Sequence, residues 1–361
     1  MESVPESYDA MFYRDKPFDL RMLQDLMRDF QVSRKPTSTL QEVISSSDVN
    51  NTDPDSWVSE LIRPEDPPLT NSFTGTMFYT RDCYLVYYEI MMECLDSGRY
   101  ECLTLCGSPG SGKSLFYLYT FNRFRRENPS ATIVTAAFYD DCVMKECWVY
   151  TPGEERKKHD KIPRIHGAIY LFDGPPSGII HNEKVICFTR PVPRWTFQQK
   201  LISRHTCLWF PMWDLDELLD ANDVCKLNLS KETLSERYDL FGGSARYCLS
   251  KEDGLVDGGH DQLRRQAARI DSFAMLHMSY EDANDDSNDI LHIRPQIDDR
   301  FPFISSKESR ICSRAVDGMI CFGIWGTYDE HELFQRAHAD YREFESRRKS
   351  MAALLTVLSK W

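Results

Sequence analysis

The chain has 361 residues, of which 42% are hydrophobic and 27% charged, and its formal net charge is -13. This length exceeds one ordinary hydrophobic core, so we expect two domains or one domain with sizeable appendages. The acidic balance disfavours nucleic acid and anionic lipid as partners, because both repel a negatively charged surface. The basic clusters at 123–126, 156–158 and 347–349 are short. We interpret them as solvated surface, with a nuclear localisation signal at 156–158 as the alternative.

Twelve cysteines are present without a C-x-x-C pair, and Cys102, Cys106, Cys187 and Cys207 lie in apolar runs. This placement indicates reduced core thiols rather than a zinc site or a disulfide framework. The first twenty residues lack the pattern of a secretory signal, and no run of about 18 apolar residues is present. We therefore expect an intracellular protein, nuclear or cytoplasmic, with no membrane partner.

The N-terminal part of the chain combines a short amphipathic helix with a polar linker. Leu20, Leu23, Met27 and Phe30 have helical spacing, whereas residues 33–56 are rich in Ser, Thr, Asp, Asn and Pro. We assign residues 1–56 to an N-terminal arm and linker. Residues 79–96 then predict a helix that ends at Ser97-Gly98.

From residue 57 to 228, strand-like and helix-like segments alternate. Helical patterns at 113–126, 195–203 and 214–221 separate apolar strand patterns, which lie at 101–106, 131–138, 167–172, 184–188 and 206–210. This alternation predicts an α/β domain with a mostly parallel, five-stranded sheet covered by helices on both faces. Residues 139–166 form a polar insertion that holds one short apolar stretch, 147–150.

The last third of the chain has a helical pattern. Segments 235–250, 262–280 and 331–361 carry it, while residues 281–300 are polar and rich in Asp. We therefore assign residues 229–361 to a helical lid and a C-terminal helical region.

Residues 107–114 read GSPGSGKS and match the phosphate-binding pattern G-x-x-x-x-G-K-[ST]. A buried-strand run precedes them and an apolar helical pattern follows, as a strand–loop–helix requires. Glycines let successive backbone amides point at phosphate oxygens, Lys113 would reach the β- and γ-phosphates, and Ser114 would ligate Mg²⁺. We expect ATP with Mg²⁺ as the ligand. The predicted binding residues are Gly107, Ser108, Pro109, Gly110, Ser111, Gly112, Lys113 and Ser114.

Residues 168–173, AIYLFD, form an apolar strand that ends in Asp173, which would hold Mg²⁺ through water. The alternative is a buried strand that ends in a turn-forming Asp-Gly. The next residue is Gly174, where many ATPases of this class have a Glu that orients the attacking water, so fast hydrolysis is in doubt. Asp140 and Asp141 could substitute for that Glu, or could be solvated strand-end charges.

Two further segments end in polar groups near the expected site. Strand 185–189 ends in Thr189, followed by Arg190. Residues 241–247, FGGSARY, place a Gly-Gly turn before a helix that carries Arg246. An arginine there can direct its guanidinium at phosphates across an interdomain cleft. The alternative is a loop–helix junction with a surface salt bridge.

Together these motifs resemble the P-loop NTPase module of the Crinkler and retrotransposon-hot-spot (RHS) superfamily. The resemblance covers roughly residues 70–330. Its most specific segments are PMWDLDEL and ERYDLFGGSAR. The other segments that carry it are GSPGSGKS, AIYLFDG, VICFTRP followed by Trp195, and the rest of LWFPMWDLDELLDA. It implies an AAA/STAND-like P-loop fold followed by a helical subdomain. It makes Thr189 the candidate γ-phosphate sensor, unless Thr189 is an ordinary strand end. It also gives Arg246 a sensor-like role and assigns Trp213, Asp214 and Glu217 to a shared structural signature.

The resemblance also carries expectations about biology. Members often carry a C-terminal restriction-type nuclease; oomycete and fungal members resemble effectors of host nuclei, and trypanosome members are nuclear. This sequence lacks the translocation leader of oomycete Crinklers and has too few residues after the NTPase for a full nuclease. Gln198-Gln199-Lys200 mimics part of a nuclease motif, which we interpret as coincidence.

We thus expect a Mg·ATP-binding NTPase that acts as an ATP-driven switch or effector-like regulator of an unidentified protein partner. Lys113, Asp173, Thr189 and Arg246 would act on the nucleotide. The first alternative is a weakly hydrolysing interaction module, which the missing Glu favours. The second is a P-loop kinase, which the large helical tail disfavours. Direct nucleic-acid binding has no support from the net charge.

Overall fold

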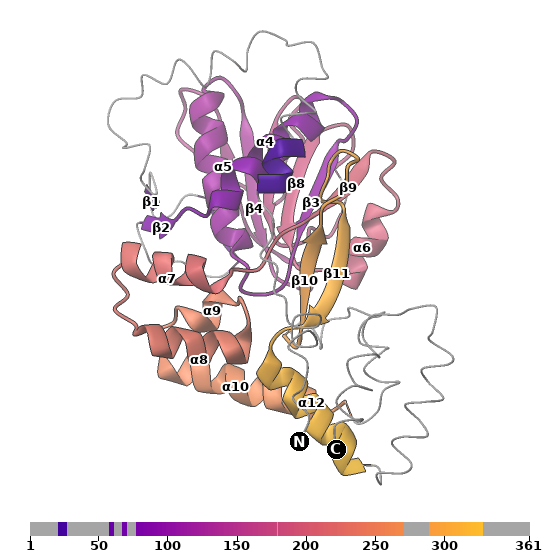
Figure 1. The fold of residues 1–361 in the computed structure, drawn as a ribbon. Helices are drawn as coiled ribbons and strands as arrows, with labels where there is room; N and C mark the ends of the chain where they lie inside the picture. Colours follow the sequence, from indigo (N-terminus) through magenta and orange to yellow (C-terminus); the bar gives the residue numbers. More distant parts are fainter. Residues whose placement is uncertain are drawn as a thin grey trace.

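The computed structural model describes residues 21–26, 58–60, 67–70, 77–178, 180–270 and 289–327. Residues 21–26 are helical, within the helix predicted for the N-terminal part. The helical segment expected at 331–361 and most of the predicted arm lie outside the described residues. Figure 1 shows an α/β part in the upper half of the molecule and a mainly helical part below it.

The central sheet has seven strands in the order β6-β5-β4-β7-β8-β3-β9. The strands are β3 (Cys102–Cys106), β4 (Ile133–Phe138), β5 (Met144–Tyr150), β6 (Lys157–Lys158), β7 (Ile169–Asp173), β8 (Lys184–Thr189) and β9 (His205–Trp209). The strands β4, β7, β8, β3 and β9 pair in parallel and correspond to the five predicted segments. The α/β class with a mostly parallel sheet is therefore confirmed.

The predicted number of five strands is wrong, because the insertion adds two. Within it, β5 pairs antiparallel with β4, and β6 pairs antiparallel with β5. In β5, Cys147, Val149 and Tyr150 are buried, whereas Lys145 is exposed and Met144, Glu146 and Trp148 are half-buried. An antiparallel strand with one solvent-exposed face has a mixed polar and apolar pattern. The polar residues of β5 therefore hid this strand in the sequence.

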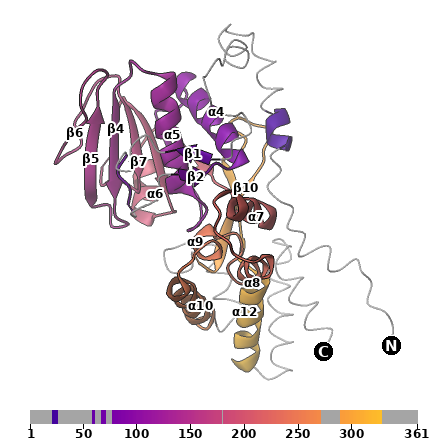
Figure 2. The same cartoon turned by 90° about the vertical axis from the view of Figure 1, so that its left-hand side faces the viewer.

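Helices cover both faces of the sheet (Figure 2). On one face, α4 (Asp82–Asp96) and α5 (Lys113–Glu127) share a core with Leu103 and Leu105 of β3. On the other face, Trp195 of α6 (Pro193–Gln199) packs in a separate cluster with Cys102. Because neighbouring side chains of a strand point to opposite faces, β3 contributes to both cores.

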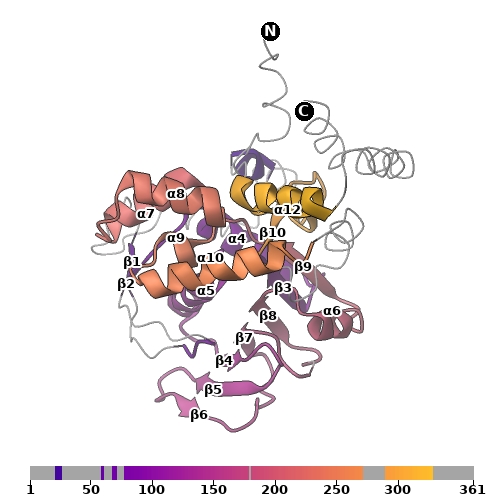
Figure 3. The ribbon, with the colours of Figure 1, turned by 90° about the horizontal axis from the view of Figure 1, so that it is seen from below.

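The lower part of the molecule has its own core, formed mainly by helices (Figure 3). Its helices are α7 (Leu215–Val224), α8 (Lys231–Phe241), α9 (Ala245–Cys248), α10 (Asp253–Ala267) and α12 (Arg314–Thr327). The antiparallel hairpin of β10 (Leu291–Gln296) and β11 (Ser306–Ile311) begins in this core with Leu291 and extends beside the sheet (Figure 1), where Ile304 packs in the sheet core. A second, small antiparallel pair joins β1 (Val58–Glu60) to β2 (Met77–Tyr79). Among the described residues, every helix is too short or too polar to cross a membrane.

Two elements of the lower part differ from the sequence prediction. The hairpin lies within a stretch expected to be polar and then helical; Pro295 and a mostly half-exposed β11 weaken its strand pattern. The helix α10 begins at Asp253, well before the predicted start at 262, although it contains three glycines. One of them, Gly259, lies against the Tyr247 ring, where a Cβ would come within 2.6 Å. Close packing against Tyr247 thus explains why a residue of low helix propensity, Gly259, lies within this helix.

Candidate phosphate-binding site

Residues 107–114 form the turn that leads from the end of β3 into the first residues of α5. Gly110 and Gly112 have positive φ angles of 77° and 95°, a conformation that side chains other than glycine rarely adopt. A Cβ on Gly110 would also lie 2.0 Å from the Ser244 hydroxyl oxygen. The predicted strand–loop–helix arrangement is therefore present, and its glycines are required by backbone conformation and by close packing.

The ammonium of Lys113 folds back over this loop. Its Nζ donates to the carbonyl oxygens of Gly107 and Ser108, both at 2.8 Å, and to the Ser111 hydroxyl at 3.2 Å. Burial, with a smaller contribution from the positive charge of Arg246, lowers the pKa of Lys113 to about 7. Loss of water around a cation disfavours its charged form. A negative ligand in this loop would reverse that effect.

Asp173, the last residue of β7, meets the start of α5. The Ser114 hydroxyl donates to Asp173 Oδ1 at 2.9 Å, although the two residues are 59 positions apart. Asp173 is 3% exposed. Burial raises its pKa, and hydrogen bonds from Thr70 and Ser114 oppose the shift. The structure thus brings together the two residues predicted to hold Mg²⁺.

Thr70 completes the surroundings of Asp173, and the sequence analysis missed it. Its backbone amide donates to Asp173 Oδ2 at 2.8 Å. Its hydroxyl lies within hydrogen-bond distance of two main-chain oxygens, Asp173 O at 2.8 Å and Phe138 O at 2.9 Å. Thr70 is 103 positions from Asp173 and belongs to no motif, so the sequence contains no signal for this contact.

Thr189 ends β8, the strand between β3 and β7, and pairs in register with Cys106. It is buried, and its hydroxyl donates to the carbonyl of Arg190 at 3.0 Å. The Arg190 guanidinium forms an ion pair with Asp140 at 3.1 Å. Asp141 accepts a hydrogen bond from a nearby backbone amide at 3.1 Å. The two acids considered as substitutes for a Glu are therefore engaged in an ion pair and in a turn.

The segment with Arg246 docks directly on the loop. The amide of Ala245 donates to Gly110 O at 3.0 Å, and the amide of Trp213 donates to Gly243 O at 3.2 Å. A Cβ on Gly243 would lie 1.9 Å from the Trp213 carbonyl oxygen, so only glycine fits there. Arg246 is exposed, and its charge acts on Lys113. Arg246 therefore lies on the same side of the molecule as the loop.

A buried arginine supports the loop from behind. Arg81 is 3% exposed and donates to Ser111 O at 2.8 Å, while its guanidinium makes two bonds to Glu217, at 2.6 and 2.8 Å. It also lies 4.5 Å from the centre of the Trp213 ring, whose Nε1 donates to Ser111 O at 3.1 Å. The nearby Asp214 caps α7 by accepting from the Glu217 amide at 2.8 Å. The residues of the PMWDLDEL segment thus position the loop.

Arg81 was not among the residues predicted from the sequence to belong to the site. The sequence placed Arg81 inside the helix predicted at 79–96, whereas the structure makes Arg81 the N-cap of α4 and shows no side-chain capping bond. This position ordinarily favours Ser, Thr, Asp or Asn. An arginine there indicates that the side chain is used elsewhere.

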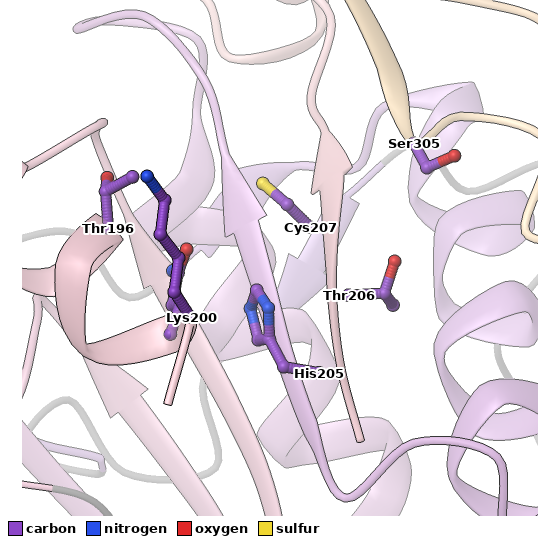
Figure 4. Close-up of a pocket in the computed structure, with 7 residues that line it drawn as sticks. Thr196, Lys200, His205, Thr206, Cys207 and Ser305 are labelled. Carbon is purple, nitrogen blue, oxygen red and sulfur yellow. The ribbon is translucent and has the colours of Figure 1, made fainter. Parts of the chain in front are cut away.

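A different polar cluster lies on the face of the sheet covered by α6. Thr104 Oγ1 lies 3.1 Å from Trp195 Nε1, 2.7 Å from Gln199 Nε2 and 3.1 Å from His205 Nε2. The first two partners are donors, so the hydroxyl proton goes to His205, whose pKa burial lowers to about 4. Beside this cluster is a cavity of about 330 Å³ (Figure 4), lined by Thr196, Gln199, Lys200, His205, Thr206, Cys207 and Ser305. Gln199, in the nuclease-like tripeptide, is therefore part of a buried structural network.

Comparison of the chain with family models, curated proteins and solved structures found no match. The site is accordingly defined by its own geometry: a glycine loop, a lysine folded over it, and a serine in contact with a buried aspartate.

Proposed function

We propose that this protein binds Mg·ATP at residues 107–114 and acts as a nucleotide-dependent switch, a P-loop NTPase of the Crinkler/RHS type. The observation that carries the proposal is the 2.9 Å hydrogen bond from Ser114 to Asp173. The two residues were predicted from separate sequence motifs. A hydrogen bond between two residues predicted independently is unexpected by chance. A serine at a helix start beside a strand-end carboxylate is the protein part of a Mg·nucleotide site.

The loop fits a phosphate group in three respects. Its backbone turns through two positive-φ glycines, which lets amides converge. It leads into the N-terminus of the 15-residue helix α5, which favours negative charge. Lys113 supplies a cation whose present partners are neutral oxygens. A triphosphate would offer that ammonium stronger, charged acceptors.

The pair Ser114 and Asp173 suits a Mg²⁺ ion that is bound together with a nucleotide. Mg²⁺ keeps several waters and usually takes one or two protein groups plus phosphate oxygens. Ser114 and Asp173 would supply those protein groups. Within the described part of the chain, no cluster of three or more His, Cys, Asp or Glu is arranged for a metal ion. When bound, Mg²⁺ would neutralise phosphate charge, while Asp173 and Ser114 orient it.

The second candidate is an interaction module that binds ATP but hydrolyses it slowly. Gly174 follows Asp173, and the nearby acid Asp140 is paired with Arg190 at 3.1 Å. A carboxylate held in an ion pair is not positioned to orient an attacking water. This pairing favours slow turnover. The kinase alternative has no comparable support from the site.

The test is nucleotide binding by a Lys113→Ala variant, measured by calorimetry. Loss of the charge-assisted contact should weaken the affinity for Mg·ATP about tenfold to a hundredfold while the fold is retained. Lys184→Ala is the matched control, because Lys184 starts β8 at the opposite end of the sheet and pairs with Asp96. Equal affinities in wild type and Lys113→Ala would disprove the proposal. Phosphate release with and without acceptors then separates ATPase, slow module and kinase.

A further inference from the structure

Residues 67–70, which we name the strap, lie across the end of the sheet where Asp173 stands. Pro67 and Pro68 are buried, and Leu69 packs against the core formed with α4 and α5. Thr70 makes the closest contacts, through its amide to Asp173 Oδ2 and through its hydroxyl to the carbonyls that end β4 and β7. The strap therefore covers the carboxyl ends of two neighbouring strands.

Both oxygens of the Asp173 carboxylate are engaged in this arrangement. Oδ1 accepts from Ser114 at 2.9 Å and Oδ2 accepts from the Thr70 amide at 2.8 Å. Asp173 is 3% exposed, so its remaining lone pairs are covered as well. A hydrated Mg²⁺ would approach through Oδ2, because Ser114 holds the other oxygen. A metal-bound water within hydrogen-bond distance of Oδ2 competes for the space that the Thr70 amide fills.

An exposed lysine fastens the strap from outside the site. Lys145 of β5 donates from Nζ to Leu69 O at 3.1 Å and to Thr70 O at 3.0 Å. Its side chain is exposed, and both bonds go to main-chain oxygens of the strap. The strap can therefore be loosened by a substitution that leaves the loop, Ser114 and Asp173 intact.

We propose that the strap is an autoinhibitory contact: in the docked position it occupies the metal-binding oxygen of Asp173, and Mg·ATP binds only as Thr70 withdraws. The inference rests on the proposed function and adds its regulation. A partner that captures the strap would activate nucleotide binding, since any binding that favours the undocked state shifts the equilibrium.

The test compares Mg·ATP affinity in Lys145→Ala, in Thr70→Val and in the wild type by calorimetry. Removing the hydrogen bonds that hold the strap should tighten Mg·ATP binding about threefold to tenfold in each variant. Thr70→Val keeps the side-chain shape and the net charge. Binding of ATP in the absence of Mg²⁺ should change less, because the strap competes with the metal. In the wild type, Mg·ATP should speed hydrogen exchange at the Thr70 amide.

Lys158→Ala is the matched control for Lys145→Ala. Lys158 lies on the adjacent strand β6, is exposed, and donates to Glu146 at 2.6 Å. The Lys158→Ala substitution removes the same charge without releasing the strap, so it should not increase the affinity for Mg·ATP.

The outcomes separate the two proposals. If Lys113→Ala weakens Mg·ATP binding as expected but Lys145→Ala and Thr70→Val bind Mg·ATP no more tightly than the wild type, the strap is not inhibitory and the nucleotide site stands. If Lys158→Ala increases the affinity for Mg·ATP as much as Lys145→Ala does, the proposal of an inhibitory strap is also wrong. If neither the wild type nor the strap variants bind ATP, both proposals fail.

Discussion

At the scale of single residues, Lys113 is poised to change its protonation on binding. Burial lowers its pKa to about 7 in the free protein. A bound triphosphate would stabilise the ammonium and raise that pKa toward its ordinary range near 10.5. Below about pH 7 the lysine is protonated in both states, so affinity should be nearly independent of pH. Above about pH 7, binding takes up a proton, and affinity should fall as pH rises.

Calorimetry of Mg·ATP binding at pH 8, in two buffers with different ionisation enthalpies, measures this uptake. We expect it to approach about one proton per nucleotide in the wild type. Lys113→Arg keeps a charge that does not titrate there, so it should take up none. An equal uptake in both proteins would assign the proton to another group.

Asp173→Asn tests the metal contact at the same scale. The amide keeps the size of the side chain but loses the charge that Mg²⁺ selects. We expect the gain in ATP affinity on adding Mg²⁺ to shrink about tenfold, since a charged contact contributes more than a neutral one. Because burial raises the pKa of Asp173, the charge is costly in the free protein. The variant should therefore fold as well as the wild type. An undiminished effect of Mg²⁺ would leave Asp173 as a strand-end residue only.

At the scale of elements, the turn between α8 and α9 is fitted to the segment before α7. A Cβ on Gly243 would lie 1.9 Å from the Trp213 carbonyl oxygen, which is backbone and cannot rotate away. Gly243→Ala should lower the free energy of unfolding by roughly 1–3 kcal/mol, as overpacking does. The measurement is urea denaturation at equilibrium.

Gly258→Ala is its counterpart within α10. An added Cβ meets nothing within 4 Å there, and the residue is helical. The substitution should raise the unfolding free energy by about 0.5–1 kcal/mol, because alanine loses less conformational entropy on folding. Equal stabilities of the two variants would contradict the contact between Gly243 and Trp213.

At the scale of the whole molecule, the loop of residues 107–114 lies between the sheet and the lower, helical part. Ala245 bonds to Gly110, and the amide of Ile293 in β10 bonds to the Ser108 hydroxyl at 2.8 Å. Both parts of the molecule therefore touch the loop that would hold phosphate. Such an arrangement can couple nucleotide state to the angle between the parts.

Arg246→Ala tests this coupling. Arg246 lies on the helical side of the loop, and its charge already acts on Lys113. We expect ATP affinity to fall modestly, about twofold to tenfold, and the difference in compactness between the ATP and ADP states to vanish. Small-angle scattering and limited proteolysis with each nucleotide measure this difference. Arg265→Ala, at an exposed position of α10, should behave as the wild type. If Arg246→Ala is still more compact with ATP than with ADP, as the wild type is expected to be, Arg246 has no sensor role.

The sequence by itself determined the parallel strands and the loop. Buried parallel strands are continuous apolar runs, and the GSPGSGKS segment combines its glycines, lysine and serine within eight residues. Such patterns are local, so one sequence is enough to recognise them. Asp173 was recognised in the same way, as the polar end of an apolar strand.

Only the tertiary structure decided which distant residues surround that loop. Thr70 contacts Asp173, Arg81 contacts the loop at Ser111 O, and Lys145 holds the strap in place. Most of these contacts are made to backbone carbonyls, namely those of Phe138, Asp173, Ser111, Leu69 and Thr70. A backbone carbonyl is present at every position, so a contact with one leaves no mark on the partner's residue type. The strand β5, next to the sheet edge, and the hairpin of β10 and β11 were missed for a related reason. Their pairing depends on which strands the fold places beside them, and a half-exposed strand has a weak pattern of its own.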